Sequence, residues 1–291
     1  MGDVRTDSNT QAGLTWAPLG RPRLHLRVTD STNDRARALA IAGAPHGTLV
    51  TAAEQTAGRG RQGRRWSAPA GSSLLASLIL RADPAGKSKG QHPGPRSPAA
   101  KSDGLHPLLP LLAAVAVCDV AGEQAMVKWP NDIVRGYTSD PKAINPTRGG
   151  CKGETTEDGM SPHALAKLAG ILVEARPQEG WAVLGIGLNV AVRLEELPAD
   201  VRVGAATMGQ TPAAIEPTLA RLLGALERRL NEPKRDLLEA YRARDALCGR
   251  DVVWSGGRGR VNGVDERGRL LVALEGGGLT TLHSGEIHLR L

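Results

Sequence analysis

The chain contains few aromatic residues and few cysteines. Aromatic side chains make up 2% of the 291 residues and Phe is missing altogether, so aliphatic side chains must fill the core. With so few rings, a protein that binds single-stranded nucleic acid by stacking its bases is disfavoured. The three cysteines, Cys118, Cys151 and Cys248, are odd in number and lie far apart, outside any CxxC pattern. This spacing argues against a disulfide framework or a structural zinc site and favours a reducing cytoplasm.

Metal-binding histidine pairs, a leader and a membrane span are missing too. The seven histidines form no HxH or HExxH arrangement, which leaves no case for that kind of metalloenzyme. The N-terminus carries Asp3, Arg5 and Asp7 and does not resemble a signal peptide. The longest apolar run, at about 108–120, is interrupted by Pro110 and is too short to cross a bilayer. The sequence therefore predicts a cytoplasmic protein that does not act at membranes.

Basic charge and room for a sizeable core are present. A length of 291 residues with 41% apolar content allows one large domain, or a large domain with a small one beside it. The net charge of +7 fits an anionic partner. A nucleotide, a nucleic acid and an acidic protein all satisfy this condition, so charge alone does not choose between them.

Alternating apolar segments predict an α/β domain followed by a small β domain. Strands are expected at about 24–28, 48–53, 73–80, 126–129, 168–174 and 181–190, and helices at about 32–41, 108–120, 211–230 and 234–247. The last two of these strands are close enough in sequence to pair as a hairpin. After Gly249, short segments between glycine-rich turns predict a small β-barrel with strands near 251–254, 260–264, 270–273, 280–283 and 287–289.

Three polar segments interrupt this pattern. Residues 1–22 are expected to form a loose N-terminal arm. Residues 82–106 and 135–163 lack a hydrophobic pattern and are expected to be disordered insertions. The predicted domains are therefore 23–247, of mixed α+β structure, and 248–291, the small barrel.

The segment from Gln55 to Trp66, QTAGRGRQGRRW, combines three glycines with four arginines. Glycine lets a loop backbone approach a ligand closely, and arginine offers a planar fork of donors to phosphate or carboxylate oxygens. The segment therefore indicates a loop that closes over an anion. A solvated basic turn, or an RG-type contact with nucleic acid, is an equally simple interpretation of this segment alone.

Four other segments carry polar or glycine residues that ordinary elements do not need. Asp30-Ser31-Thr32-Asn33 lies between a strand and a helix, where it can bind a polar ligand, although an ordinary N-cap explains it as well. KWPND, residues 128–132, places a cation, an aromatic ring and a carboxylate at a turn. Lys167 begins the apolar strand KLAGILVE, where a solvated strand end is the simple alternative. Gly185 and Gly187 interrupt the strand GIGLNV, which weakens it unless something approaches its backbone.

Taken in order, these five motifs resemble those of the biotin protein ligases, which attach biotin to the carrier domain of biotin-dependent carboxylases. The order is STN, QTAGRGRQGRRW, KWPND, KLAGILVE and GIGLNV, across about residues 24–190, with the small C-terminal domain in support. The resemblance implies a mixed-sheet catalytic domain similar to class II aminoacyl-tRNA synthetases and an SH3-like C-terminal barrel. It also implies that biotin and ATP, with Mg²⁺, yield biotinyl-5′-AMP, from which biotin passes to a lysine of a biotin carboxyl carrier protein.

The resemblance assigns roles to individual residues. Those implied in binding biotin are Ser31, Thr32, Asn33, Gln55, Gly58, Arg59, Gly60, Arg61, Lys167, Gly170 and Gly187. Those implied in binding ATP or the adenylate are Arg59, Arg61, Arg64, Trp66, Lys128, Asn131, Asp132, Lys167 and Asn189, with Asp132 a candidate for Mg²⁺. Cations are needed to bring the biotin carboxylate to the α-phosphate and to stabilise the transition state. The implied catalytic cations are Arg59, Arg61, Lys128 and Lys167.

Several alternatives remain open at this point. A lipoate ligase has a similar fold and also forms an acyl-adenylate, although the full Gly/Arg loop with KWPND favours biotin. A basic nucleic-acid-binding module and an inactive regulatory binder are alternatives of other classes. Some family members carry an N-terminal DNA-binding helix-turn-helix, for which the roughly 23 residues before the first strand are too few. Operator binding is therefore not expected. The protein is expected to be a monomer or a weak homodimer.

Overall fold

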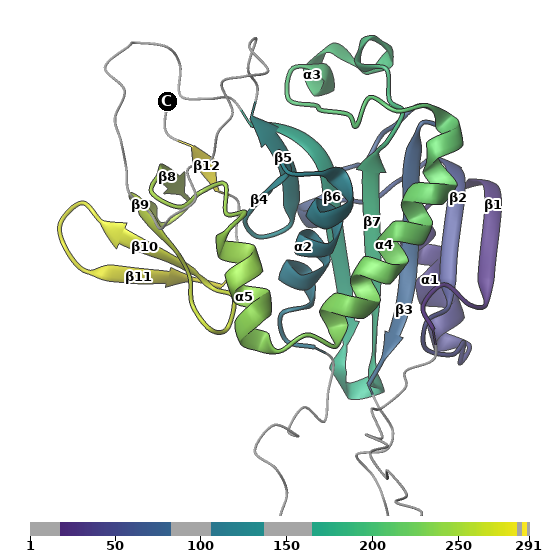
Figure 1. Cartoon of the computed structure of the whole chain (residues 1–291), viewed down its shortest axis with the longest axis horizontal. Coiled ribbons are helices and arrows are strands. Elements are labelled where there is room, and N and C mark those ends of the chain that lie inside the picture. The colour runs from purple at the N-terminus through teal and green to yellow at the C-terminus, as the bar shows by residue number, and fades with distance from the viewer. Residues whose placement is uncertain (1–17, 83–105, 137–164, 284–286, 290–291) are drawn as a thin grey trace, which may run out of the picture.

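A seven-stranded mixed sheet forms the centre of the larger part of the chain (Figure 1). The computed structural model describes residues 18–82, 106–136, 165–283 and 287–289. The strands are β1 (Arg23–Thr29), β2 (Leu49–Gln55), β3 (Ser73–Arg81), β4 (Met126–Lys128), β5 (Asp132–Gly136), β6 (Leu165–Arg176) and β7 (Trp181–Asn189). Their order is β1-β2-β3-β7-β6-β5-β4, with β1 and β2 parallel and the other neighbours antiparallel. The predicted mixed sheet and the β6–β7 hairpin are confirmed.

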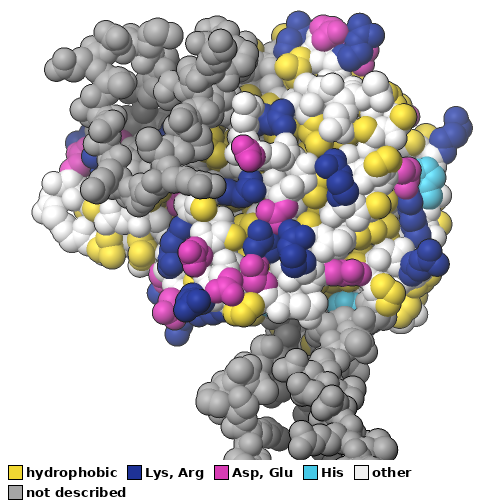
Figure 2. Space-filling model, viewed as in Figure 1, with side chains coloured by type: hydrophobic (Ala, Val, Ile, Leu, Met, Phe, Trp, Pro, Cys, Tyr) yellow, Lys and Arg dark blue, Asp and Glu magenta, His cyan; other side chains and the backbone are white. Residues whose placement is uncertain are grey.

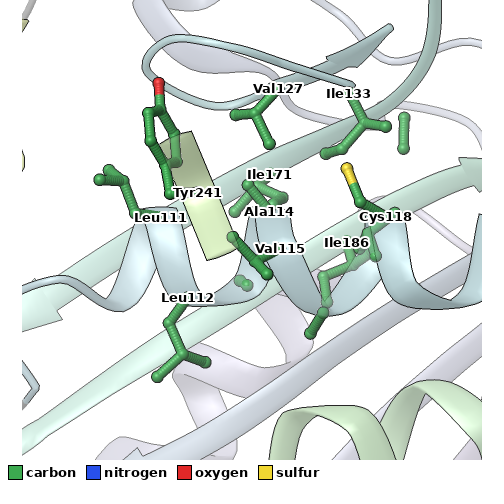
Figure 3. Close-up of a cluster of buried hydrophobic side chains, with 14 of the residues drawn as sticks. Leu111, Leu112, Ala114, Val115, Cys118, Val127, Ile133, Ile171, Ile186 and Tyr241 are labelled. Atoms are coloured by element: carbon green, nitrogen blue, oxygen red, sulfur yellow. The ribbon is translucent and has the colours of Figure 1, made fainter. Parts of the chain in front are cut away.

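Helices cover both faces of this sheet. Helix α1 (Thr32–Ile41) connects the parallel strands β1 and β2 and packs on one face through small side chains, Ala36 and Ala40. The opposite side carries α2 (Leu109–Ala121), α4 (Ile215–Leu230) and α5 (Lys234–Arg242). Helix α2 is apolar around almost its whole circumference because it lies between the sheet, α4 and α5 (Figure 3). The fold therefore leaves the α1 side of the sheet for polar chemistry.

Strand β3 places one polar group beside α1. Alternate residues of a strand face opposite sides of the sheet. Leu74 and Leu78 pack in the core on the α2 side, whereas Ile79 packs on the α1 side. Ser77 shares the side of Ile79 and is completely buried. The register therefore brings a hydroxyl beneath the N-terminus of α1.

A five-stranded antiparallel sheet forms the C-terminal part. Its strands are β8 (Asp251–Trp254), β9 (Gly257–Val264), β10 (Leu270–Leu274), β11 (Leu279–Leu282) and β12 (His288–Leu289), in the order β11-β10-β9-β8-β12. Five strands were expected after Gly249 and five are found in the described residues. The turn between β9 and β10 contacts the larger sheet, because Trp129 Nε1 donates to the carbonyl oxygen of Gly268 at 3.0 Å. The aromatic residue of KWPND therefore anchors the C-terminal sheet.

The predicted helix at 234–247 is wrong at its C-terminal end, since α5 ends at Arg242. The residues that follow run along the edge strand β4. The N–H of Val127 donates to the carbonyl of Arg244 at 2.7 Å, and the N–H of Ala246 donates to the carbonyl of Val127 at 2.9 Å. These bonds cover an otherwise open edge of the sheet, which explains why the helix stops early.

Two elements and one bond are not predicted by the sequence pattern. Strand β5 is short and follows the KWPND turn directly, and helix α3 (Ala199–Arg202) has only four residues. Of the cysteines in the described residues, Cys118 is free and buried, whereas Cys248 is disulfide-bonded. The sequence spacing argues against a disulfide framework, and one bonded cysteine is not such a framework; spacing alone does not decide which thiols meet in a fold.

Other predictions fall largely outside the described residues. These are the arm at 1–22 and the insertions at 82–106 and 135–163. In the part of the chain that the structure describes, no helix is both long and apolar enough to cross a membrane.

Candidate functional site

The predicted motifs meet at one cavity between the N-terminus of α1, the Gln55–Trp66 loop and strands β6 and β7. Its walls include most of the predicted site residues: Ser31, Thr32, Asn33, Gln55, Arg59, Gly60, Arg61, Arg64, Trp66, Asn131, Lys167, Gly170 and Gly187. The walls are completed by Arg65, Ile171, Leu172, Gly185 and Ile186. Four predicted residues are not part of these walls: Gly58, Lys128, Asp132 and Asn189.

The polar floor of the cavity consists of Ser31, Thr32, Asn33 and Gln55, at the start of α1. The N-cap interpretation of the segment Asp30–Asn33 is confirmed at Ser31, whose Oγ accepts from the N–H of Asp34 at 3.4 Å. The Oε1 of Gln55 accepts from the N–H and the hydroxyl of Thr32, at 2.7 and 3.0 Å. These two bonds fix the Gln55 carboxamide with its NH₂ group as the remaining donor side.

Asn33 organises this floor from below. Its Oδ1 accepts from the buried hydroxyl of Ser77 at 2.7 Å, and its Nδ2 donates to Glu174 Oε2 at 2.9 Å. Gly185 lies directly against it, since a Cβ atom at residue 185 would overlap Asn33 Oδ1. Both ends of the Asn33 amide are therefore engaged within the protein, and its glycine neighbour makes room for Asn33 itself.

Trp66 lies flat on the two strand glycines that face the cavity. A Cβ atom at Gly187 would lie 2.6 Å from Trp66 Cε2, and one at Gly170 would lie 3.1 Å from Trp66 Cζ3. The Nζ of Lys167 is 5.8 Å from the centre of the indole ring. Gly58 supports this packing from the loop, because a Cβ there would lie 2.5 Å from the carbonyl oxygen of Trp66. The strand glycines therefore leave room for the Trp66 indole to pack directly against the backbone of β6 and β7.

The Gly/Arg loop is closed by backbone pairing. Trp66 N donates to the carbonyl of Gly58 at 2.9 Å, and Gly60 N donates to the carbonyl of Arg64 at 2.7 Å. Between these bonds, Gln62 has a positive φ of 55°, which lets the chain reverse. The loop is therefore a short irregular hairpin that presents Arg59 and Arg61 in different directions.

Arg59 points to two carboxylates. Its Nη1 lies 2.8 Å from Asp34 Oδ1 and 3.0 Å from Glu174 Oε1. Burial alone lowers the pKa of Arg59, but the carboxylates of Glu174 and Asp34 outweigh burial, so the pKa is raised. Arg59 lines the cavity as predicted, yet its guanidinium is bound to α1 and β6.

Arg61 and Lys167 form the cationic side of the cavity. Arg61 Nη1 donates to Asn131 Oδ1 at 2.9 Å, and Asn131 Nδ2 in turn donates to the carbonyl of Ile171 at 2.9 Å. Lys167 Nζ lies 2.7 Å from Asp132 Oδ1, outside hydrogen-bond angles. Burial lowers the pKa of the Arg61 guanidinium, and Asp132 offsets only part of this effect. The two cations are therefore held by the KWPND turn from behind.

The remaining predicted residues lie behind the walls. Lys128 pairs with Asp132 across the β4–β5 hairpin and is half-buried. Asn189 is buried, with Nδ2 donating to the carbonyl of Ala206 at 2.9 Å and Oδ1 accepting from Ser73 Oγ at 3.2 Å. Asn189 therefore ties β7 to β3 and to the following loop, and its contact with a nucleotide stays a prediction.

Sequence reasoning misses three residues that shape the site: Ser77, Glu174 and Asp34. Ser77 is the single hydroxyl inside the apolar run Leu74–Leu80, and an isolated polar residue in a buried strand is a usable signal. Glu174 ends the KLAGILVE motif and has the same kind of signal, a charge in an apolar strand. Asp34 carries no comparable mark, since an acidic residue in the first turn of a helix is ordinary.

Comparison with known proteins agrees with these motifs. A sequence model of the Biotin/lipoate A/B protein ligase family matches residues 25–190, which is more than half of the chain. The biotin--[acetyl-CoA-carboxylase] ligase of Mycobacterium tuberculosis is 32% identical over 96% of this chain and 92% of its own length. The bifunctional ligase/repressor BirA of Bacillus spizizenii is 29% identical over 98% of this chain and 79% of its own length.

A solved structure supports the fold independently. The biotin protein ligase of Aquifex aeolicus, in complex with biotin and ATP, matches with a TM-score of 0.64 at 23% identity, across 93% of this chain and 99% of that one. At this identity the match establishes the fold alone. The family match and the relative above 30% identity confirm the resemblance seen in the sequence, and the chain belongs to the biotin/lipoate A/B protein ligase family.

Proposed function

We propose that this chain is a biotin protein ligase: it forms biotinyl-5′-AMP from biotin and ATP and transfers biotin to a lysine of a carrier domain. One observation carries this proposal. A single cavity combines a hydroxyl and amide floor, an apolar wall of Leu172 and Trp66, and the cations Arg61 and Lys167. The relatives named as biotin--[acetyl-CoA-carboxylase] ligases support the same reaction.

Each part of biotin has a matching part of the cavity. The ureido group needs hydrogen bonds, for which the Ser31 hydroxyl and the Gln55 amide lie in the floor. The bicycle and its chain need apolar cover, for which Leu172 and the Trp66 indole lie in the wall. The carboxylate would then face Lys167. Asn33 contributes by holding the floor in place, since its own amide is bound to Ser77 and Glu174.

In the first step, an oxygen of the biotin carboxylate attacks the α-phosphorus of ATP and pyrophosphate leaves. Both reactants are anionic, so fixed cations are needed to reduce their repulsion and to stabilise the charge on the phosphoryl oxygens. Lys167 and Arg61 supply these charges. Asp132 and Asn131 hold them, at 2.7 and 2.9 Å, so little reorganisation is required when the substrates arrive.

Mg²⁺ would accompany ATP. No group of three or more His, Cys, Asp or Glu side chains suited to a metal occurs in the described ranges. Nucleotide-bound Mg²⁺ needs only one or two carboxylates because the phosphates supply other ligands. Asp132, beside Lys167, is the carboxylate that would fill this role, and the ion would neutralise phosphate charge.

The second step passes biotin to the carrier. The ε-amine of a carrier lysine attacks the acyl carbon of the mixed anhydride and AMP leaves, so no covalent enzyme nucleophile is required. Water would hydrolyse the same anhydride, and the Gln55–Trp66 loop is the part of the cavity wall suited to exclude it. The partner is therefore a biotin carboxyl carrier domain.

Two other functions are weaker. The family name covers lipoate ligases, but the relatives from Mycobacterium tuberculosis and Paracoccus denitrificans are named as biotin--[acetyl-CoA-carboxylase] ligases. For a nucleic-acid module, a continuous basic surface is needed. On the face shown in Figure 2, Lys and Arg side chains lie among Asp and Glu. Ion pairs also neutralise single arginines, since Arg228 and Arg229 lie 2.8 and 2.9 Å from Asp119 Oδ2.

Finer features accompany this proposal. We propose that the larger sheet is related to that of class II aminoacyl-tRNA synthetases and that the C-terminal sheet is SH3-like. The domain boundary would lie near residue 247, where β4 receives its last partner and β8 soon begins. A cytoplasmic location, a monomer or weak homodimer and the lack of operator binding stay predictions.

Pyrophosphate release tests the function directly. The protein is given ATP and Mg²⁺ with biotin, with lipoate, or with neither, and without any carrier. Biotin-dependent release is the expected result. Release with lipoate alone would move the substrate to the alternative, and silence with both from folded protein would contradict the proposed adenylation.

A further inference from the structure

The carboxylate of Glu174 connects the Gly/Arg loop to the polar floor of the cavity. Its Oε2 accepts from Asn33 Nδ2 at 2.9 Å, and its Oε1 lies 3.0 Å from Arg59 Nη1. Asn33 continues the chain of contacts to the buried hydroxyl of Ser77. One side chain therefore touches both the residues beneath the ligand space and the loop above it.

We propose that Glu174 is a positioning residue, which holds the Gly/Arg loop closed over the biotin floor through Arg59. This inference rests on the proposed function for its consequence in catalysis, but the contact itself does not. Glu174 does not line the cavity, whereas Asn33 and Arg59, its two partners, do. It acts through them and touches no reacting atom.

Partial burial makes this link suitable for holding a loop. The Glu174 side chain is 23% exposed and Arg59 is 39% exposed, so solvent and salt screen the pair less than they screen a fully exposed one. Asp34 supplies a second carboxylate to the same guanidinium at 2.8 Å. Arg59 thus fixes the loop to both α1 and β6.

The geometry separates the roles of the two loop arginines. Arg59 faces carboxylates that compete with a phosphate for its charge. Arg61 faces the neutral amide oxygen of Asn131, which a phosphate oxygen can replace with a gain in attraction. Loop closure therefore belongs to Arg59 with Glu174, and anion binding belongs to Arg61.

Glu174→Gln tests the link with little change in shape. Gln has one acceptor oxygen, so it cannot accept from Asn33 and Arg59 with separate oxygens as Glu174 does. In the absence of substrates, amide hydrogen exchange across residues 58–66 is expected to become about fivefold faster. Glu216→Gln is the control, because it removes an Arg–Glu contact of 2.6 Å to Arg23, remote from the loop; exchange across 58–66 should then equal that of the wild type.

The kinetic readout separates positioning from a merely structural role. With biotin as substrate, Glu174→Gln should raise KM for biotin about tenfold while kcat changes less than about threefold, because closure of the loop stabilises ground and transition states alike. The proposal would be overturned if loop amide exchange and KM for biotin both stayed at their wild-type values. It would also be overturned if the unfolding midpoint fell while amide exchange rose across the whole chain rather than in the loop alone. Should Glu174→Gln not fold, Arg59→Gln breaks the same pair from the more exposed side and is judged by the same outcomes. If wild-type protein releases no pyrophosphate with biotin, the proposed function fails, while loop exchange still decides the role of Glu174.

Discussion

Replacing Lys167 with Ala is expected to stop most adenylate formation without unfolding the protein. Lys167 is one of two cations held in the cavity wall, with its Nζ 2.7 Å from Asp132 Oδ1 and 5.8 Å from the centre of the Trp66 ring. Removing a preorganised donor of this kind costs about 10²–10³ in kcat, or about 3–4 kcal/mol of transition-state stabilisation. The fold should lose much less, because the side chain is 39% exposed and an exposed ion pair contributes about 0–1 kcal/mol.

The assay is single-turnover formation of biotinyl-5′-AMP at saturating ATP and biotin, with thermal unfolding of the same samples. Lys234→Ala is the matched control. Lys234 begins helix α5, does not line the cavity, is 49% exposed and has its Nζ 3.5 Å from Glu266 Oε2. It should leave both rate and unfolding midpoint close to those of the wild type. A Lys167→Ala protein that forms adenylate within about threefold of the wild-type rate would refute the assignment. The charge of Lys167 would then contribute far less to transition-state stabilisation than a preorganised catalytic donor does.

Three further changes follow from individual contacts. Gly185→Ala should displace Asn33, raise KM for biotin about tenfold and destabilise the fold by about 1–3 kcal/mol in urea unfolding. Gly204→Ala is the control: its Cβ position has open space around it, so KM and the urea midpoint should stay at their wild-type values. Trp129→Phe removes the 3.0 Å hydrogen bond to Gly268 and should cost about 1–3 kcal/mol by the same measurement; an unchanged urea midpoint would contradict this. Burial raises the pKa of Asp245 to about 6, so the folded state binds its proton more tightly than the unfolded chain does, and this residue lowers stability as pH rises from about 4 to about 6. Asp245→Asn should remove that loss, at most about 3 kcal/mol, and urea midpoints at pH 4 and 7 should show the gap between variant and wild type widening toward pH 7.

Residues whose signal is local could be predicted from the sequence. The segment Asp30–Asn33 predicts an N-cap, because a hydroxyl before a helix accepts from the first turn, and the structure has that bond at Ser31. The two glycines of GIGLNV predict that a group approaches the backbone of this strand closely, because glycine otherwise weakens a strand. The approaching groups are Asn33 and Trp66, and only their packing in three dimensions identifies them.

Contacts that depend on register and chain reversal could not be predicted. Glu174 faces Arg59 because β6 pairs with β7 in the register Glu174↔Val183, and a shift of one residue would turn it to the α2 side. The end of α5 depends on hydrogen bonds to Val127, more than a hundred residues earlier in the chain. Local propensity predicts neither the side of the sheet that Glu174 faces nor the residue at which α5 ends, because both depend on contacts with distant parts of the chain.

The Gly/Arg loop concentrates positive charge in a few residues, and its stability therefore depends on how each charge is matched. Arg59 is neutralised by Asp34 and Glu174, and Arg65 donates to the carbonyl of Thr56 at 3.1 Å. Arg61 donates to the amide oxygen of Asn131, and the nearby carboxylate of Asp132 offsets only part of the lowering of its pKa by burial. A closing loop needs permanent partners, while an anion site needs a partner that can be displaced. In the proposed ligase the loop meets both needs, because Arg59 faces two carboxylates and Arg61 faces a neutral oxygen. Gly60 lies between them with an extended backbone, and its missing Cβ atom, which would lie 3.2 Å from the carbonyl oxygen of Arg64, leaves room for the pairing that closes the loop.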